Sequence, residues 1–175
     1  MNLFIVKEIR NKYDGLPRNP DEIDEIVIHG TGGGTAKGII KWMSSDTCER
    51  KENYKKSIGL FHYEIDRNGD IYEIMHPDYR WAYHSGSGKH DRKTIGIELV
   101  NPSAGNKDDY TDEQYDSLIV LIKKLTDSFE VRRIVSHDFN RKKYSNIEPK
   151  PCPGPLFDWN RIAVFPGIDI FSGGN

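Results

Sequence analysis

The chain has 175 residues, of which 36% are apolar and 30% are charged, and its formal net charge is −2. A chain of this length can bury a full hydrophobic core without disulfides or a structural metal. It lacks the concentrated basic surface that attracts nucleic acids and anionic membranes. We therefore expect no nucleic-acid binding and no stable membrane association. Without repeats, low-complexity tracts or linkers, residues 1–175 should form a single domain, and we expect a monomer.

The N-terminal segment MNLFIVKEIRNKY contains an apolar run that is too short for a signal peptide. No apolar stretch in the chain approaches the length that spans a membrane. We therefore expect the protein to be cytoplasmic as synthesised. In a reducing compartment Cys48 and Cys152 would remain thiols rather than form a disulfide.

The first regular elements are expected between residues 26 and 44. Residues 26–29 (IVIH) form a β-branched run that stops at a glycine-rich stretch, which predicts a buried strand ending in a loop. His29 would lie at the carboxyl end of that strand. Residues 35–44 carry apolar side chains at helical spacing. Residues 46–57 are polar, which favours an exposed excursion with Cys48 as a surface thiol.

The middle of the chain indicates a hairpin followed by a central strand. Residues 61–65 and 71–74 flank Asn68 and Gly69, a pair that supplies the positive φ angles of a tight turn. Residues 95–100 (IGIELV) are almost wholly apolar, which is typical of a central strand.

The second half begins with the strongest helical pattern. Residues 111–129 place apolar side chains on one face, and Thr111 with Gln114 forms a capping box. Residues 131–136 predict a strand ending at His137, and 157–165 predict a closing helix. Together the elements predict a single-domain α/β fold with a central mixed β-sheet flanked by helices, and functional loops at one set of strand ends.

A metal site is the chemical hypothesis that the residues themselves suggest. His29 and His137 each follow an apolar strand, and Cys152 lies between two prolines that restrict its loop. Two imidazoles and a thiolate suit zinc, and three protein ligands leave a fourth position open for water. Spacing alone is weak evidence, because a buried cysteine and two unrelated histidines are the more ordinary reading. His76 and His90 are expected to have no functional role.

Several segments in fixed order strengthen the hypothesis. They are HGTGGG after IVI, FHYEIDRNGDIYEI, WAYHSGSG, TIGIELVN, and VSHDFNRKK through KPCPGPLFDW. In this order they resemble the motifs of the zinc-dependent N-acetylmuramoyl-L-alanine amidases, over about residues 26–159. That family includes phage lysins and wall-recycling amidases, and the peptidoglycan recognition proteins are related to it. The resemblance implies their fold and cleavage of the amide bond between N-acetylmuramic acid and L-alanine in peptidoglycan or muropeptides.

The resemblance also implies roles for individual residues. It makes His29, His137 and Cys152 the zinc ligands, Glu98 the acid/base that serves the activated water, and Lys150 a cation that stabilises the oxyanion. The alternative for Glu98 is a buried carboxylate that pairs with a nearby cation, and we favour the functional role over it. Without the resemblance, Lys150 would read as a solvated loop lysine.

One position departs from the family pattern. Many members carry a tyrosine immediately before the histidine of the second strand, where this chain has Phe61, which cannot donate a hydrogen bond. Tyr63 is a weak substitute, since it lies on the same face as Phe61 but two positions along the strand. The resemblance places His84, with Trp81 and Phe61, near the substrate. Trp81 could equally serve only to pack the fold.

Two other functions stay open at this point. A peptidoglycan-binding module without activity would keep the groove but lose the cysteine ligand, and here Cys152 is present. A cysteine peptidase would use Cys152 as nucleophile, although its proline neighbours supply restraint and no activating charge. The residues do not decide whether the substrate is intact cell wall or a soluble muropeptide, nor which stem peptide is preferred. We favour a phage lysin that acts on the wall once the membrane is opened.

Overall fold

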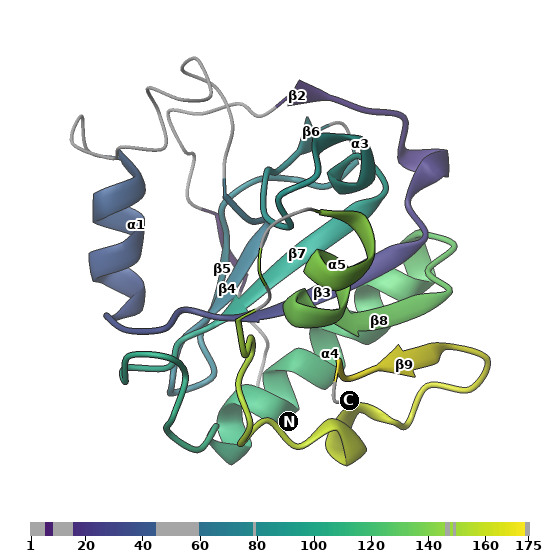
Figure 1. The fold of residues 1–175 in the computed structure, drawn as a ribbon. Helices are drawn as coiled ribbons and strands as arrows, with labels where there is room; N and C mark the ends of the chain where they lie inside the picture. The colour runs from purple at the N-terminus through teal and green to yellow at the C-terminus, as the bar shows by residue number, and fades with distance from the viewer. Residues whose placement is uncertain are drawn as a thin grey trace.

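The computed structural model describes residues 6–8, 16–44, 60–78, 80–145, 148 and 150–173 (Figure 1). Its centre is a seven-stranded sheet in the order β1-β5-β4-β7-β3-β8-β9. All neighbouring strands run parallel except the antiparallel pair β4 and β5, so the sheet is mixed, as predicted. In sheet order the strands are Val6–Glu8, Ile71–Glu73, Tyr63–Ile65, Thr94–Leu99, Glu25–Gly30, Arg133–Ser136 and Asp169–Phe171.

A second sheet and a set of helices complete the described fold. The second sheet pairs β2 (Leu16–Pro17) with β6 (Arg80–Trp81) in antiparallel register. The α-helices are α1 (Ala36–Ser44), α3 (Gly88–Asp91), α4 (Asp112–Ser128) and α5 (His137–Tyr144). Two short 3-10 helices, η1 (Pro20–Glu22) and η2 (Trp159–Ile162), lie in the connections. Within the described ranges, every helix is too short or too polar to cross a membrane.

The two central strands, β3 and β7, confirm the predicted positions of the apolar runs. They pair in parallel over their whole length, from Glu25 with Thr94 to Gly30 with Leu99. Both are covered on both faces, which is why they read as nearly continuous apolar segments rather than as alternating ones. Their carboxyl ends therefore meet at the same edge of the sheet.

The face of the sheet opposite His29 holds the main hydrophobic core. Helix α4 covers this face, and its amino end carries the predicted capping box between Thr111 and Gln114. The core gathers the inward-facing side chains of β3, β4, β7 and β8 with those of α4. Its fully buried members include Ile26, Ile28, Ile65, Ile95, Ile97, Leu99, Leu118, Leu121, Ile122 and Ile134.

Helix α1 packs a second, smaller apolar cluster on the other side of the sheet (Figure 1). We call this the α1 cluster; its buried members are Ala36, Met43, Phe61, Tyr72, Ile74 and Val100. The predicted helix over residues 35–44 is thereby confirmed. The predicted excursion over residues 46–57, with Cys48, lies outside the described residues.

The hairpin of β4 and β5 forms where predicted, but its turn differs in detail. Only Gly69 has a positive φ, 82°, while Asn68 does not. The Gly69 amide donates to the carbonyl oxygen of Asp66 at 2.9 Å. A Cβ on Gly69 would come within 2.8 Å of Ser117 Oγ on α4, so the turn also needs glycine for its close approach to that helix.

The end of the chain corrects one expectation. The helix predicted over residues 157–165 is only the 3-10 turn η2, Trp159–Ile162. The Asp158 side chain caps its start, accepting from the Asn160 amide, and Pro166 disfavours helical geometry at Phe165. The chain continues into β9, which pairs with β8 and was not predicted.

Candidate metal centre

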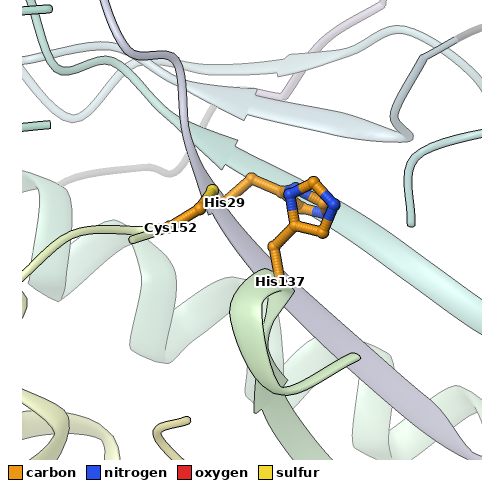
Figure 2. A group of neighbouring side chains, drawn as sticks. All are labelled: His29, His137 and Cys152. Carbon is orange, nitrogen blue, oxygen red and sulfur yellow. The ribbon is translucent and has the colours of Figure 1, made fainter. Parts of the chain in front are cut away.

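Three potential ligands converge at the carboxyl edge of the sheet. The ligand atoms of His29, His137 and Cys152 all lie within 4.8 Å of one another. The imidazole rings of the two histidines have their centroids 4.3 Å apart. Figure 2 shows the three side chains directed toward a common region from three different segments of the chain. Their spacing in the sequence was weak evidence for a shared site, and the fold brings the three residues into one cluster.

Parallel pairing of β3 and β8 brings the two histidines together. Ile28 and Ser136 are register partners, so His29 and His137 are the next residues along neighbouring strands. His29 is still inside β3, whereas His137 is the first residue of α5. This helix was not predicted, although Ser136 as its cap, Asp138 in its first turn and the lysines in its last turn are recognisable signals.

The loop that carries Cys152 is held from three sides. The Tyr110 hydroxyl donates to the carbonyl oxygen of Pro153 at 2.7 Å, and the Asp138 amide donates to that of Cys152 at 3.2 Å. The Gly30 amide approaches Cys152 Sγ at 3.4 Å. Burial raises the pKa of the Cys152 thiol, and the carboxylate of Glu98 adds to the increase. A cation is therefore needed to favour the thiolate, which suits a metal ligand better than a nucleophile.

A hydrogen-bonded chain behind His29 fixes its orientation. His29 Nε2 lies 3.0 Å from His84 Nδ1, and His84 Nε2 lies 2.8 Å from Thr94 Oγ1. The Thr94 hydroxyl donates its only hydrogen to the carbonyl oxygen of Asp91 at 3.2 Å. His84 must then donate to Thr94 through Nε2 and accept from His29 through Nδ1. In this arrangement Nδ1 of His29 is the nitrogen that would bind a metal, because a hydrogen bond at one ring nitrogen of a histidine orients the other toward the ion.

Burial makes this assignment consistent with a neutral His84. The residue is 7% exposed, and burial lowers its pKa well below the usual value, with His62 as the next cause. Gly96 on β7 makes room for the ring, because a Cβ there would lie 2.8 Å from His84 Cγ. The glycine inside the apolar run IGIEL thus has a steric reason.

A cavity of about 350 Å³ opens in front of the three ligands. Glu98 faces it from β7, where it is the register partner of His29. Phe61 and His84, both predicted to contact substrate, also line it. Trp42 of α1 lines the cavity and is 41% exposed, a position that the sequence analysis did not single out. The remaining lining residues are Gly30, Thr31, Ile39 and Leu60.

Two predicted site residues are not brought to this cavity. Lys150 is exposed and is not among its lining residues. Trp81 is 4% exposed and lies below the Arg92 guanidinium, 5.7 Å from it, and beside Tyr83. The structure therefore supports the packing role of Trp81 that the sequence left open.

Other residues that the sequence weighed have different surroundings. Tyr63 belongs to the main core and lies on the face opposite the cavity. The alternation argument for Phe61 and Tyr63 fails because β4 begins only at Tyr63. His90 contacts Glu25 at 2.8 Å far from the ligands, and His76 is partly exposed beside Asp78, 3.5 Å away.

The family model described as N-acetylmuramoyl-L-alanine amidase matches residues 19–155 of the chain. The search of curated proteins found no sequence that matches this chain.

Solved structures with a similar fold include an endolysine N-acetylmuramoyl-L-alanine amidase, LysCS from Clostridium intestinale URNW. It is 20% identical with a TM-score of 0.66, and the match covers 92% of this chain and 94% of that one. A selenomethionine derivative of AmpD is 23% identical with a TM-score of 0.66, covering 91% and 93%. The human PGRP-IβC structure, in complex with glycosamyl muramyl pentapeptide, is 14% identical with a TM-score of 0.65, covering 91% and 92%. At these identities the likenesses show the fold.

Proposed function

The chain belongs to the family of N-acetylmuramoyl-L-alanine amidases, enzymes that act on peptidoglycan, and from this membership we propose that it is a zinc-dependent member. His29, His137 and Cys152 are the proposed ligands. The observation that carries the proposal is the convergence of their ligand atoms within 4.8 Å of one another, at the floor of a cavity. The reaction proposed is hydrolysis of the amide bond between N-acetylmuramic acid and L-alanine.

The donor set fits zinc chemically. Two nitrogen donors and one sulfur donor match the borderline-soft character of zinc, and three ligands leave a position open toward the cavity. The hydrogen bond between His29 Nε2 and His84 would present the other ring nitrogen of His29 to a bound ion. Zinc bound there supplies a Lewis acid that activates water at neutral pH and polarises the scissile carbonyl.

Glu98 is the proposed general base and acid. It lies beside His29 in register and faces the cavity from β7. Its carboxylate takes a proton from the attacking water and passes it to the departing L-alanine nitrogen, as a positioned carboxylate with access to both atoms can do. Lys150, two residues before Cys152, is proposed to stabilise the oxyanion. Because it is exposed, its ammonium group would have to reach the cavity when substrate is bound.

Substrate contacts are proposed for the walls of the cavity. Phe61 and His84 line it and would contact the muramyl or peptide part of the substrate. Trp81 is the weakest of the proposed substrate residues because it is buried outside the lining. Phe61 cannot donate a hydrogen bond as the tyrosine of many members can, so stabilisation of the oxyanion would fall to a bound zinc ion as Lewis acid and to the ammonium group of Lys150 as hydrogen-bond donor.

We propose a phage lysin as the biological setting. The resemblance to small phage lysins supports it, and one protein of similar fold is described as an endolysine. A cytosolic enzyme that recycles soluble muropeptides is the second candidate. A non-catalytic peptidoglycan-binding module is less favoured, because Cys152 and Glu98 are both present at the cavity.

The test is a product assay with controlled metal content. Purified protein is incubated with sacculi and, separately, with soluble muropeptides, and the new amino termini are identified. We expect free L-alanine termini, loss of activity after chelation, and recovery on adding zinc. Release of L-alanine peptides without any metal requirement, or loss of activity only on thiol alkylation, would contradict the zinc mechanism. Faster release of peptides from sacculi would favour the lysin, and faster cleavage of soluble muropeptides would favour the recycling enzyme.

A further inference from the structure

Glu64 is a buried acid that the mechanism above does not use. It is 0% exposed, and both carboxyl oxygens lack a hydrogen-bond donor among the described residues. An isolated ionised carboxylate in such a place is strongly unfavourable, so the group must be neutral or must serve a neighbouring residue. A leucine of similar volume would bury well at this position, and the presence of an acid therefore needs a reason.

The sheet register places Glu64 next to the proposed catalytic base. Glu64 on β4 is the register partner of Glu98 on β7, and Glu98 is in turn the partner of His29 on β3. Neighbouring strands lie about 4.8 Å apart, and register partners of parallel strands point to the same face. The flanking pairs, Tyr63 with Ile97 and Ile65 with Leu99, point into the main core instead. The two carboxyl groups are thus adjacent on the cavity face.

The surroundings of Glu64 keep it protonated. Burial raises the pKa of Glu64 to about 9, with the charge of Glu98 as the next cause and that of Asp66 as the third. From β5 it faces the phenol of Tyr72, its other register partner.

His62, two residues before Glu64, is also buried, and this burial lowers the pKa of its imidazole well below the usual value. Helix α1 contributes the apolar Ala36 and Met43 to the adjoining α1 cluster. No described cation therefore offsets a negative charge on Glu64 at close range. At neutral pH the group is a carboxylic acid with one O–H donor.

We propose that Glu64 is a positioning residue whose protonated carboxyl group donates a hydrogen bond to the carboxylate of Glu98. This bond holds Glu98 ionised and fixed in the orientation that faces the cavity. A carboxylate that accepts an O–H from a neighbouring acid forms one of the stronger hydrogen bonds available in a protein. The inference rests on the proposed function, because it assigns Glu64 to the residue proposed as the base.

Two substitutions in the zinc-loaded full chain separate this role from a structural one. Glu64→Gln keeps an N–H donor without a charge, whereas Glu64→Leu keeps volume but has no donor. We expect Glu64→Gln to retain near wild-type kcat. Glu64→Leu should lose roughly 10- to 100-fold in kcat, as losses of outer-shell partners do, with little change in KM and with equal or higher thermal stability. A purely structural Glu64 predicts wild-type kcat in Glu64→Leu. That result, or an equal loss in both variants, would overturn the proposal.

The protonation of Glu64 has a readout independent of activity. In the unfolded chain Glu64 has its ordinary pKa of 4.5, whereas burial in the folded chain raises this pKa to about 9. Between these values folding takes up a proton, so wild-type stability falls as pH rises, and the penalty is absent below the lower value. The Tm advantage of Glu64→Gln over wild type should grow from about pH 5.5 to about pH 8.5. A pH-independent difference would show that Glu64 is not held as a neutral acid.

A double-mutant cycle on stability tests the contact itself. Glu64→Leu and Glu98→Leu, measured singly and together, should show a stabilising coupling between the two side chains. If the wild-type protein releases no L-alanine peptides while the coupling is present, the proposed function fails and the contact stands. If the wild type is active and the coupling is zero, the contact alone is wrong.

Discussion

Glu25 and Glu64 are both fully buried acids on the cavity face of the sheet, yet their surroundings differ. Glu25, at the amino end of β3, is contacted by His90 at 2.8 Å, by Asn140 at 2.8 Å and by the Arg133 guanidinium at 3.1 Å. These partners come from α3, α5 and β8, so the acid ties three elements to the central strand. Glu64 has no such donor among the described residues and faces another acid.

The contrast between Glu25 and Glu64 shows two different roles for a buried acidic residue. At the amino end of β3 the protein partners its own acid: His90 and Asn140 contact one carboxyl oxygen, and the charge of Arg133 lies 3.1 Å from the other. At the carboxyl end the protein gathers His29, His137, Cys152 and Glu98 around a cavity, the site proposed for an ion and a substrate. Substitutions at the first end should therefore change stability, and those at the second should change chemistry.

The largest effect is expected from the metal ligands. Cys152→Ala, and equally His29→Ala or His137→Ala, should reduce bound zinc from about one equivalent to nearly none and abolish amidase activity, because two ligands hold zinc too weakly. Metal analysis of the purified variants measures this. Cys48→Ala is the matched control and should keep its zinc. Full zinc occupancy in Cys152→Ala would remove that residue from the ligand set.

Glu98→Gln should separate catalysis from metal binding. Glutamine keeps the shape of the side chain but cannot take a proton, so kcat should fall by roughly two to four orders of magnitude. Zinc content and folding should be unchanged, and product release from peptidoglycan gives the rate. Near wild-type digestion by this variant would rule out the general-base role.

Glu25→Gln tests the amino end of β3. Removing the charge weakens the contacts of Glu25 with Arg133, His90 and Asn140, although Arg133 keeps Asp24 at 3.4 Å. Loss of hydrogen bonds and charge pairing at a buried acid predicts a destabilisation of about 3 kcal/mol. Urea unfolding of the zinc-loaded protein measures the change. The kcat per folded molecule should stay at the wild-type value; a large drop in kcat would mean that the two ends of the strand are coupled.

His90→Phe should have the smallest effect of these changes. Phenylalanine keeps the ring that stacks on Tyr144 with a centroid distance of 3.7 Å, but it cannot donate to Glu25. Loss of one hydrogen bond to a charged group predicts about 2 kcal/mol of destabilisation with unchanged activity. An effect as large as that of Glu25→Gln would show that His90, rather than Arg133, is the dominant partner.

Several elements could be read from the sequence because their causes are local. The capping box of Thr111 and Gln114 and the apolar period of α4 act within a few residues, and both are found in the structure. The apolar runs of β3 and β7 likewise identified the central strands. The resemblance pointed to the three proposed zinc ligands, and the fold brings their side chains together.

Other features depend on pairing between distant segments and had no local signal strong enough to predict them. Strand β9 is three residues long and forms only because β8 offers it an edge. The 3-10 turn η2 replaced a predicted helix because Asp158 and Pro166 limit it from both ends. Glu64 looked like an ordinary residue of a hairpin, where alternation predicts only which face it takes.

The sequence by itself determined which segments form strands and helices and which residue types are available for chemistry, since propensity, capping and periodicity act over short distances. Tertiary structure alone decided that Glu64 lies beside Glu98, that His84 orients His29, and that Trp81 and Lys150 lie outside the cavity lining. The first of these placements follows from the register of β4 and β7. Strand register is set by burial of one face of the sheet against α4. That burial involves several segments at once, so it cannot be read from any one of them.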